Sequence, residues 1–184
     1  MLEIRIHGRG GQGSVIASKI LASAFFKENK YVQAFPAFGV ERRGAPVAAF
    51  VRIDDQPILL RTNIYNPDHI VVLDPSLLEG IDVTEGLKEN GWIILNAAGN
   101  GLEVKGVQKF LIARVDASSI ALKHGLGTPR APIVNTAILG AFARATGLIR
   151  LESIIEAIRE EVPLNKDNNV EATIEAFEQT IIMR

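Results

Sequence analysis

The feature that most constrains the fold is a glycine-rich turn near the start of the chain, between a strand pattern and a helix pattern. Apolar and charged residues alternate over residues 2–7, which is typical of a strand, and the stretch GRGGQG follows at once. Apolar residues then recur at near-helical spacing from 12 to about 27. A second strand is predicted over 31–35, so this segment predicts a Rossmann-like β-α-β unit whose two strands pair in parallel.

The middle of the chain alternates strand patterns with short helix patterns. Two runs that flank the sequence DDQ predict an antiparallel hairpin, formed by residues 47–53 and 57–61. Short, strongly apolar runs predict three buried strands, at 70–74, 92–96 and 111–116. Short helices are predicted between these strands, at 77–87 and 117–124.

The last third of the chain has a helical pattern. A loop rich in glycine and proline is predicted over 125–132, followed by a buried helix over 133–146 that ends at Gly147. Two amphipathic stripes, Leu151 to Val162 and Val170 to Ile181, predict two more helices. No linker or repeat divides the 184 residues. We therefore predict a single domain over residues 1–184, a three-layer α/β/α fold with a mostly parallel, mixed sheet and a helical C-terminal part.

The composition excludes several classes of function. The formal net charge is −1 and no long run of Lys or Arg occurs, so we expect no binding to nucleic acid or to a membrane surface. The chain has no cysteine, which excludes disulfides, thiolate metal sites and iron–sulfur ligation within it. Its three histidines lack metal-ligand spacing, so no metal site is expected. No signal-peptide pattern is visible, and we expect a cytoplasmic protein.

The glycine turn is the best-defined candidate for ligand binding. Glycine lets the backbone approach a ligand closely, and the helix that follows presents free N–H groups to an anion such as phosphate or carboxylate. The alternative is a turn that serves only close packing of helix and strand. The candidate binding residues in this turn are Gly8, Gly10, Gly11, Gln12 and Gly13.

A dinucleotide is not the expected ligand of this turn. NAD-binding and FAD-binding units need an acidic residue at the end of the second strand, where this chain has Ala34, Phe35 and Pro36. Glu28 lies before that position and Glu41 lies in the loop beyond it. The Gly-Lys-Ser/Thr motif of nucleotide-hydrolysing P-loops is also absent.

A second candidate loop carries a cluster of charges, and other polar residues follow the strands. Arginine suits carboxylate or phosphate groups and protein interfaces, although a solvated charged turn is the alternative. Ligands of parallel sheets bind at the carboxyl ends of strands, whereas an aspartate there also serves as a helix cap. The candidates in the loop are Glu41, Arg42, Arg43 and Gly44, and those elsewhere in the crevice are Asp74, Asn96, Thr128 and Asn135.

Three stretches together resemble the gamma subunits of 2-oxoacid:ferredoxin oxidoreductases. They are GRGGQG after the first strand, FPAFGVERRGAPV after the second and NTAILGAFARATGLI in the late buried helix. Their order and spacing match the family from Leu2 to about Asn169. The form ERRGAPV is similar to the pyruvate branch, including the branched-chain 2-oxoacid enzymes, rather than to the 2-oxoglutarate branch.

The resemblance implies a non-catalytic subunit of a multi-subunit enzyme. Such an enzyme decarboxylates a 2-oxoacid on thiamine diphosphate, passes electrons through iron–sulfur clusters to ferredoxin and transfers the acyl group to coenzyme A. This chain has neither cysteines nor a Gly-Asp-Gly motif for magnesium diphosphate, so thiamine diphosphate, Mg²⁺ and the clusters are expected in alpha, beta and delta-type partners. We expect no cofactor on this chain alone, and the glycine and Arg loops to face coenzyme A or another subunit. The alternative is a free-standing nucleotide-binding or small-molecule-binding α/β module.

Overall fold

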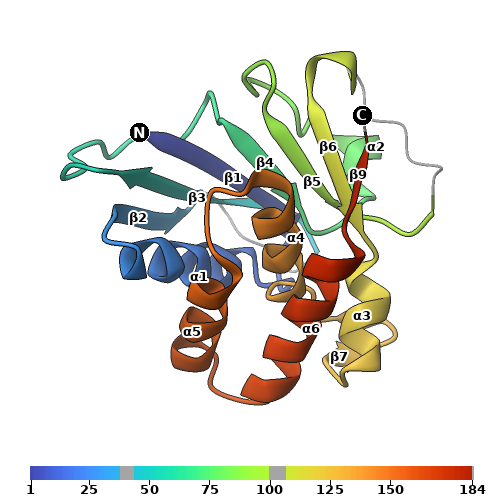
Figure 1. Ribbon diagram of the computed structural model, residues 1–184. Helices are drawn as coiled ribbons and strands as arrows, with labels where there is room; N and C mark the ends of the chain where they lie inside the picture. The colour runs from blue at the N-terminus through green and yellow to red at the C-terminus, as the bar shows by residue number, and fades with distance from the viewer. Residues whose placement is uncertain (38–43, 100–106, 184) are drawn as a thin grey trace.

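The computed structural model describes residues 1–37, 44–99 and 107–183, which form a mixed β-sheet with a layer of helices (Figure 1). The strands of the sheet are β1 (Leu2–Arg9), β2 (Tyr31–Pro36), β3 (Pro46–Asp54), β4 (His69–Val72), β5 (Trp92–Asn96), β6 (Leu111–Val115) and β9 (Ile181–Met183). Their order in the sheet is β2-β3-β1-β4-β5-β6-β9.

Most strands of the sheet run in the same direction. β1 pairs in parallel with β4, β4 with β5, and β5 with β6. β3 is antiparallel to both β1 and β2, and β9 is antiparallel to β6, so β2 shares the direction of β1. The predicted α/β class with a mostly parallel, mixed sheet is confirmed.

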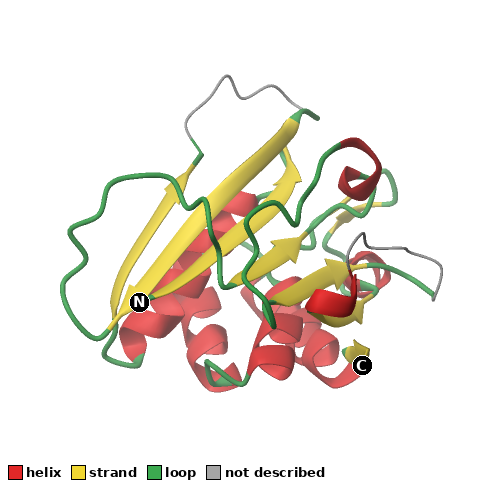
Figure 2. Ribbon diagram, turned by 90° about the horizontal axis from the view of Figure 1, so that it is seen from above, coloured by secondary structure: helices red, strands yellow, loops and turns green. Residues whose placement is uncertain are grey.

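The main hydrophobic core lies between one face of the sheet and the long helices, which Figure 2 shows on one side of the strands. The helices on this face are α1 (Ser14–Lys27), α3 (Ala117–Lys123), α4 (Ala137–Thr146), α5 (Leu151–Glu161) and α6 (Lys166–Gln179). Ile4, Ile6 and Val71 point into this core and are fully buried. The helices are amphipathic or wholly apolar, so burial of these side chains holds the layer on the sheet.

A smaller core covers the opposite face over β4, β5 and β6. Ile70, Val72 and Ile93 pack there against Val83, Leu87 and the short helix α2 (Leu77–Gly80). In the described residues, the α-helix of this second outer layer is α2, which is four residues long. The third layer of the predicted α/β/α arrangement is thus thinner than the helical patterns suggested.

The prediction that the first two strands pair with each other is wrong. β3 lies between them, paired with β1 from Leu2–Ile53 to Arg9–Pro46 and with β2 along its other edge. α1 still joins two strands of the same direction, but its crossover skips one position in the sheet. The β-α-β pattern predicts that its two strands run in the same direction. It does not predict whether another apolar strand lies between them in the sheet.

The predicted hairpin of residues 47–53 with 57–61 is also wrong. Both edges of β3 are already paired, so no position remains for residues 57–61 beside it. Leu59 is 87% exposed, and the carbonyl oxygen of Leu60 accepts a hydrogen bond of 2.9 Å from the Gln33 side chain. This segment therefore runs over β2 as a loop.

Three helix predictions extended beyond the observed helices. The helix predicted at 77–87 ends at Gly80, because the Asp82 carboxylate accepts a hydrogen bond from the Thr84 backbone N–H at 2.9 Å and forms a competing turn. At the end of the chain α6 stops at Gln179, and Ile181 lies in strand β9 rather than on the last helix. The helix predicted from 133 begins at Ala137 and ends, as predicted, at the left-handed cap Gly147.

The loop predicted at 125–132 contains a small hairpin. Its strands are β7 (Gly127–Thr128) and β8 (Ala131–Pro132), paired antiparallel with Pro129 and Arg130 at the tip. Two-residue strands are below the length that a sequence pattern can indicate. The hairpin leads into the segment that precedes α4 and presents Arg130 at the carboxyl end of the sheet.

A buried histidine lies on β1, on the face away from the long helices. The Arg5 guanidinium donates a hydrogen bond of 2.9 Å to Nε2 of His7, and His7 is 6% exposed. Burial, helped by the positive charge of Arg5, lowers the pKa of His7 to about 3. The imidazole is therefore neutral in the folded chain at every pH above that value.

We expect this histidine to make the fold sensitive to mild acid. The unfolded chain has a His pKa of about 6.5, so between about 3 and 6.5 it binds more protons than the folded chain and stability falls as pH falls. Urea titrations at pH 7 and pH 5 should differ by about 2 kcal/mol from this group. In His7→Gln the loss should shrink by that amount, and an unchanged pH profile would contradict the buried, neutral assignment.

We expect Gly140→Ala to destabilise the chain, although alanine is the better helix former by about 1 kcal/mol. A Cβ on Gly140 in α4 would lie 2.0 Å from the carbonyl oxygen of Thr173 in α6, so the two helices must separate. The free energy of unfolding should fall by about 1–3 kcal/mol in urea denaturation. Gly80→Ala is the matched control, because nothing lies within 4 Å of its added Cβ. Equal stability of both variants would refute the close helix contact.

Candidate functional site

The glycine turn lies at the carboxyl end of β1, between β1 and β4. From β1 the chain crosses toward β2 on one side, and from β4 it proceeds through β5 and β6 on the other. The carboxyl ends of β1 and β4 therefore meet where the strand order reverses. In open α/β sheets this is the position at which ligands bind.

The turn is closed by the side chain of Gln12. Its Oε1 accepts a hydrogen bond of 2.7 Å from the Arg9 backbone N–H, and the Gln12 backbone N–H donates to the Arg9 carbonyl oxygen at 2.9 Å. Gly11 and Gly13 have positive φ, at 95° and 81°, a conformation in which L side chains are strained. These bonds hold the turn in one shape without a ligand.

The N-terminus of α1 opens into the space beside this turn. Its N-cap is Gly13, which provides no side-chain cap, and the first helical turn contains no acidic residue. The backbone N–H groups of residues 13–16 have no hydrogen-bond partner among the described residues. Together with the helix dipole, these free donors favour an anion at this position.

Arg9 and Asp74 form an ordered polar cluster on one wall. The Arg9 guanidinium lies 3.2 Å from the Asp74 carboxylate and also donates to Ser76 Oγ at 2.8 Å. Partial burial raises the pKa of Asp74, but hydrogen bonds from Ser76 and Gln12 and the charge of Arg9 outweigh it, and the pKa lies below its usual range. Asp74 is thus ionised at neutral pH, and its partners fix the wall of the turn.

The end of the charged loop is attached to the glycine turn. The Gly44 backbone N–H donates to the Gly10 carbonyl oxygen at 3.0 Å, and the Gly10 N–H donates to the Ala45 carbonyl oxygen at 2.9 Å. The Gly44 carbonyl oxygen accepts a hydrogen bond of 3.1 Å from Arg9. Glu41, Arg42 and Arg43 lie outside the described residues.

These groups surround a cavity of about 670 Å³, a size typical of small-molecule sites. Its lining comes from the glycine turn with the start of α1, from Asp74, and from the β7–β8 hairpin with the segment before α4. The lining residues are Arg9, Gly10, Gly11, Gln12, Gly13, Ile16, Gly44, Asp74, Arg130, Ala131, Pro132, Ile133 and Asn135.

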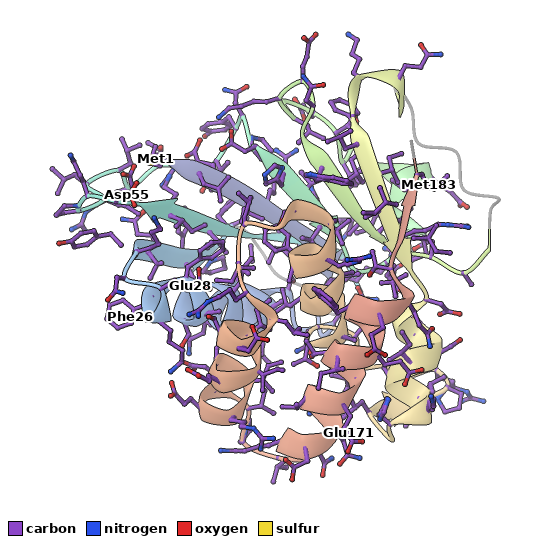
Figure 3. The ribbon with its side chains drawn as sticks, in the orientation of Figure 1. Met1, Phe26, Glu28, Asp55, Glu171 and Met183 are labelled. Atoms are coloured by element: carbon purple, nitrogen blue, oxygen red, sulfur yellow. The ribbon has the colours of Figure 1, made fainter. Side chains whose placement is uncertain are left out.

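A second cavity, of about 350 Å³, lies at the other end of β1, where Figure 3 labels Met1 and Asp55. Its charges pair with one another: the Met1 amino group lies 3.1 Å from Asp54, and Lys30 lies 2.5 Å from Asp55. Because these charges are already compensated, the first cavity is the better candidate site.

A comparison with known protein families matches almost the whole chain. The family model described as pyruvate ferredoxin/flavodoxin oxidoreductase matches residues 3–181. The chain belongs to the pyruvate ferredoxin/flavodoxin oxidoreductase family.

Several relatives match along nearly their full length. The subunit gamma common to the pyruvate and ketoisovalerate oxidoreductases of Thermococcus kodakarensis is 58% identical over 99% of this chain and 98% of its own. The pyruvate synthase subunit PorC of Methanothermobacter marburgensis is 52% identical over 97% of each chain. The crystal structure of the pyruvate oxidoreductase subunit PORC from Thermotoga maritima is similar at a TM-score of 0.83, with 38% identity over 100% of this chain and 98% of that chain. The predicted resemblance to gamma subunits is confirmed.

The structure brings together most of the residues that the sequence predicted for the crevice. Gly10, Gly11, Gln12, Gly13, Gly44, Asp74 and Asn135 all line the larger cavity. Gly8, Asn96 and Thr128 are not among its described lining residues. Asn96 instead joins the end of β4 to α3, through hydrogen bonds to the Leu73 carbonyl oxygen and Ser118.

Sequence reasoning missed several lining residues of the cavity. Arg9 was inside the quoted glycine motif, but its role depends on Asp74, which lies 3.2 Å away in the segment after β4. Arg130 lies in the loop GLGTPRAP, and only the fold shows that it lines the same cavity as the start of α1. The apolar residues Ile16 and Ile133 had no signal beyond their place in helical patterns.

Other classes of site find no support in the described residues. No group of three or more His, Asp or Glu side chains has a metal-binding arrangement in the described ranges. Among the described helices, none has the length and apolar character needed to cross a bilayer.

We expect Gly13→Ala to cost more stability than its backbone conformation alone explains. The added Cβ would lie 2.5 Å from the Asn135 amide nitrogen, in addition to the strain of φ 81°. Strain of this kind costs about 1–3 kcal/mol, and overpacking adds a similar amount.

The matched control is Gly44→Ala, whose φ of 82° is nearly the same while nothing lies within 4 Å of its Cβ. Thermal or urea denaturation should show the larger loss for Gly13→Ala, and Asn135→Ala should relieve part of it in the double variant. Equal losses for the two glycines would show that Asn135 does not pack against the turn.

Proposed function

We propose that this chain is the gamma subunit of a pyruvate:ferredoxin oxidoreductase, which makes an acyl-coenzyme A and CO₂ from a 2-oxoacid. The observation that carries the proposal is the end-to-end match to gamma subunits, 58% identical over 99% of this chain. The relatives from Thermococcus and Pyrococcus bear names that assign them to both pyruvate and ketoisovalerate oxidoreductases. We therefore propose that one chain of this type can serve more than one 2-oxoacid enzyme.

In this proposal the chain contributes structure and a binding surface rather than the redox chemistry. A protein without cysteine has no thiolates for iron–sulfur clusters. Thiamine diphosphate, Mg²⁺ and the clusters would belong to alpha, beta and delta-type partners, with ferredoxin as the electron acceptor. The substrate range would then be set by those partners, which agrees with a gamma subunit shared between enzymes.

The glycine crevice is proposed to contact coenzyme A in the assembled enzyme. Its unpaired backbone N–H groups at the start of α1 and the charge of Arg130 favour a phosphate group. The loop that contains Glu41, Arg42 and Arg43 is proposed to meet either coenzyme A or a partner subunit. Its attachment at Gly44 to Gly10 supports a position at the rim of the same crevice.

The test is to produce the tagged chain with and without the subunits encoded beside its gene. Produced together, it should copurify with brown, cluster-containing chains, and the complex should reduce a viologen dye with pyruvate and coenzyme A. Alone, it should be colourless and inactive, because it lacks the ligands for clusters.

A tagged Gly140→Ala chain, which is expected to be less stable, is the control for association that does not depend on the fold. It should copurify with less of the partner subunits than the native chain does. Turnover by the pure single chain would contradict the division of labour. Failure of the native chain to copurify with any partner would contradict the role as a subunit.

A further inference from the structure

The loop between β3 and β4 presents apolar side chains to solvent. Figure 1 shows this loop on the side of the sheet opposite the long helices. Leu59, Leu60 and Tyr65 are 87%, 46% and 69% exposed, within seven positions of one another in the sequence. Single exposed apolar residues are common on protein surfaces, whereas a concentration of large ones is typical of a binding surface.

The side of this loop that faces the sheet is held by polar contacts. Arg52 of β3 is fully buried and lies on the outer face of the sheet, because its neighbour Ile53 points into the main core. Its guanidinium lies 2.8 Å from the Glu3 carboxylate. The same group donates hydrogen bonds of 3.4 Å to Thr62 Oγ1 and to the Asn63 carbonyl oxygen. A buried arginine thus fixes the middle of the loop from below.

Contacts on both sides of these bonds fix the backbone that carries the exposed side chains. Before them, the Gln33 side chain donates a hydrogen bond of 2.9 Å to the Leu60 carbonyl oxygen. After them, Ile64 is buried, and the Tyr65 carbonyl oxygen lies 2.0 Å from where a Cβ on Gly86 would be. The loop is therefore held in one shape while its large apolar side chains stay in water. Their favourable burial is not used by the fold of the single chain.

The exposed side of the loop carries one charge. Arg61 is exposed and is the only charged residue within positions 56–66, and it forms no ion pair in the part of the chain that the structure describes. The aspartates that precede the loop are already paired, Asp54 with the amino group of Met1 and Asp55 with Lys30. A carboxylate for Arg61 must therefore come from another molecule.

This charge also argues against a second copy of the chain as the molecule that covers the loop. Positions 56–66 contain no Asp or Glu, so two copies of the loop face to face would bring Arg61 toward Arg61. Like charges brought together at an interface lower the affinity. A different protein that offers an apolar groove and a carboxylate fits both features of the loop.

We infer that Leu59, Leu60, Arg61 and Tyr65 form a docking surface for a partner subunit, which presents an apolar groove with a carboxylate at its edge. Tyrosine and arginine are enriched among the residues that dominate binding energy at interfaces. A loop already fixed by Arg52 loses little conformational freedom when it binds. None of the four residues lines the glycine crevice. The inference rests on the proposed function, in which this chain is a subunit of a larger enzyme.

The test uses the full chain, produced together with the subunits encoded beside its gene. Leu59→Ser and Tyr65→Ser should each raise the dissociation constant of the chain from the complex about tenfold or more, the effect of losing an interface hot spot. Mass photometry over a dilution series measures this constant. Arg61→Glu should also weaken assembly. The matched control is Leu164→Ser, between α5 and α6, which changes a leucine that is 75% exposed and should assemble as the parent does.

Melting temperatures distinguish a docking role from a structural one. Leu59→Ser and Leu164→Ser should both melt as the parent does, because neither side chain is packed in the single chain. A clearly lower melting temperature of Leu59→Ser alone would show that Leu59 stabilises the fold and would overturn the inference. Parental assembly of both Leu59→Ser and Tyr65→Ser would overturn it while leaving the proposed function intact. Failure of the parent to copurify with any partner would contradict both.

Two further measurements identify what covers the loop. Amide hydrogen exchange of residues 58–66 should be slower in the complex than in the free chain, and equal exchange would overturn the inference. Sedimentation of the free chain should give the same mass for the parent and for Leu59→Ser. A parent dimer that Leu59→Ser converts to a monomer would assign the surface to a second copy and overturn the choice of a partner subunit.

Discussion

The arrangement of the whole molecule depends on the two different partners of β1. Along one edge β1 is antiparallel to β3 over its full length, and along the other it is parallel to β4. The strand order therefore reverses beside β1, and the turn that follows it is left at the open end of the sheet. The glycine turn, the start of α1 and the Arg9–Asp74 pair all take their positions from this pairing.

The sequence predicted which segments form strands and helices better than it predicted which strands lie side by side. The strand at Trp92–Asn96 and the cap at Gly147 were placed correctly, because local propensity and glycine conformation determine them. The position of β3 was not predictable, since the sequence of an apolar strand does not specify which strand it will pair with. The length of α2 depended on one side-chain turn at Asp82. The strand β9 depended on the free edge of β6, with which it pairs.

The candidate site was predicted in part, for a related reason. Gly10 to Gly13 belong to one contiguous motif, which can be read without a fold. Arg130 and Ile133 reach the same cavity from a segment more than a hundred positions later, and no spacing rule connects them to the motif. Asn135 was a candidate by type, but its unpaired oxygen and its contact with the Gly13 position are properties of packing alone.

The pairing of β1 also has a consequence for the order of folding. Ile4 finds its partners in Val51 and His69, so neither edge of the first strand can be completed by local hairpin formation. Loops must close before these contacts are gained, and such long-range pairing slows folding relative to helical proteins. During synthesis the N-terminal strand emerges first and stays unpaired until β3 and β4 leave the ribosome. The crevice is thus assembled late, because residues 9–13 meet residues 130–135 only after more than a hundred further positions have been synthesised.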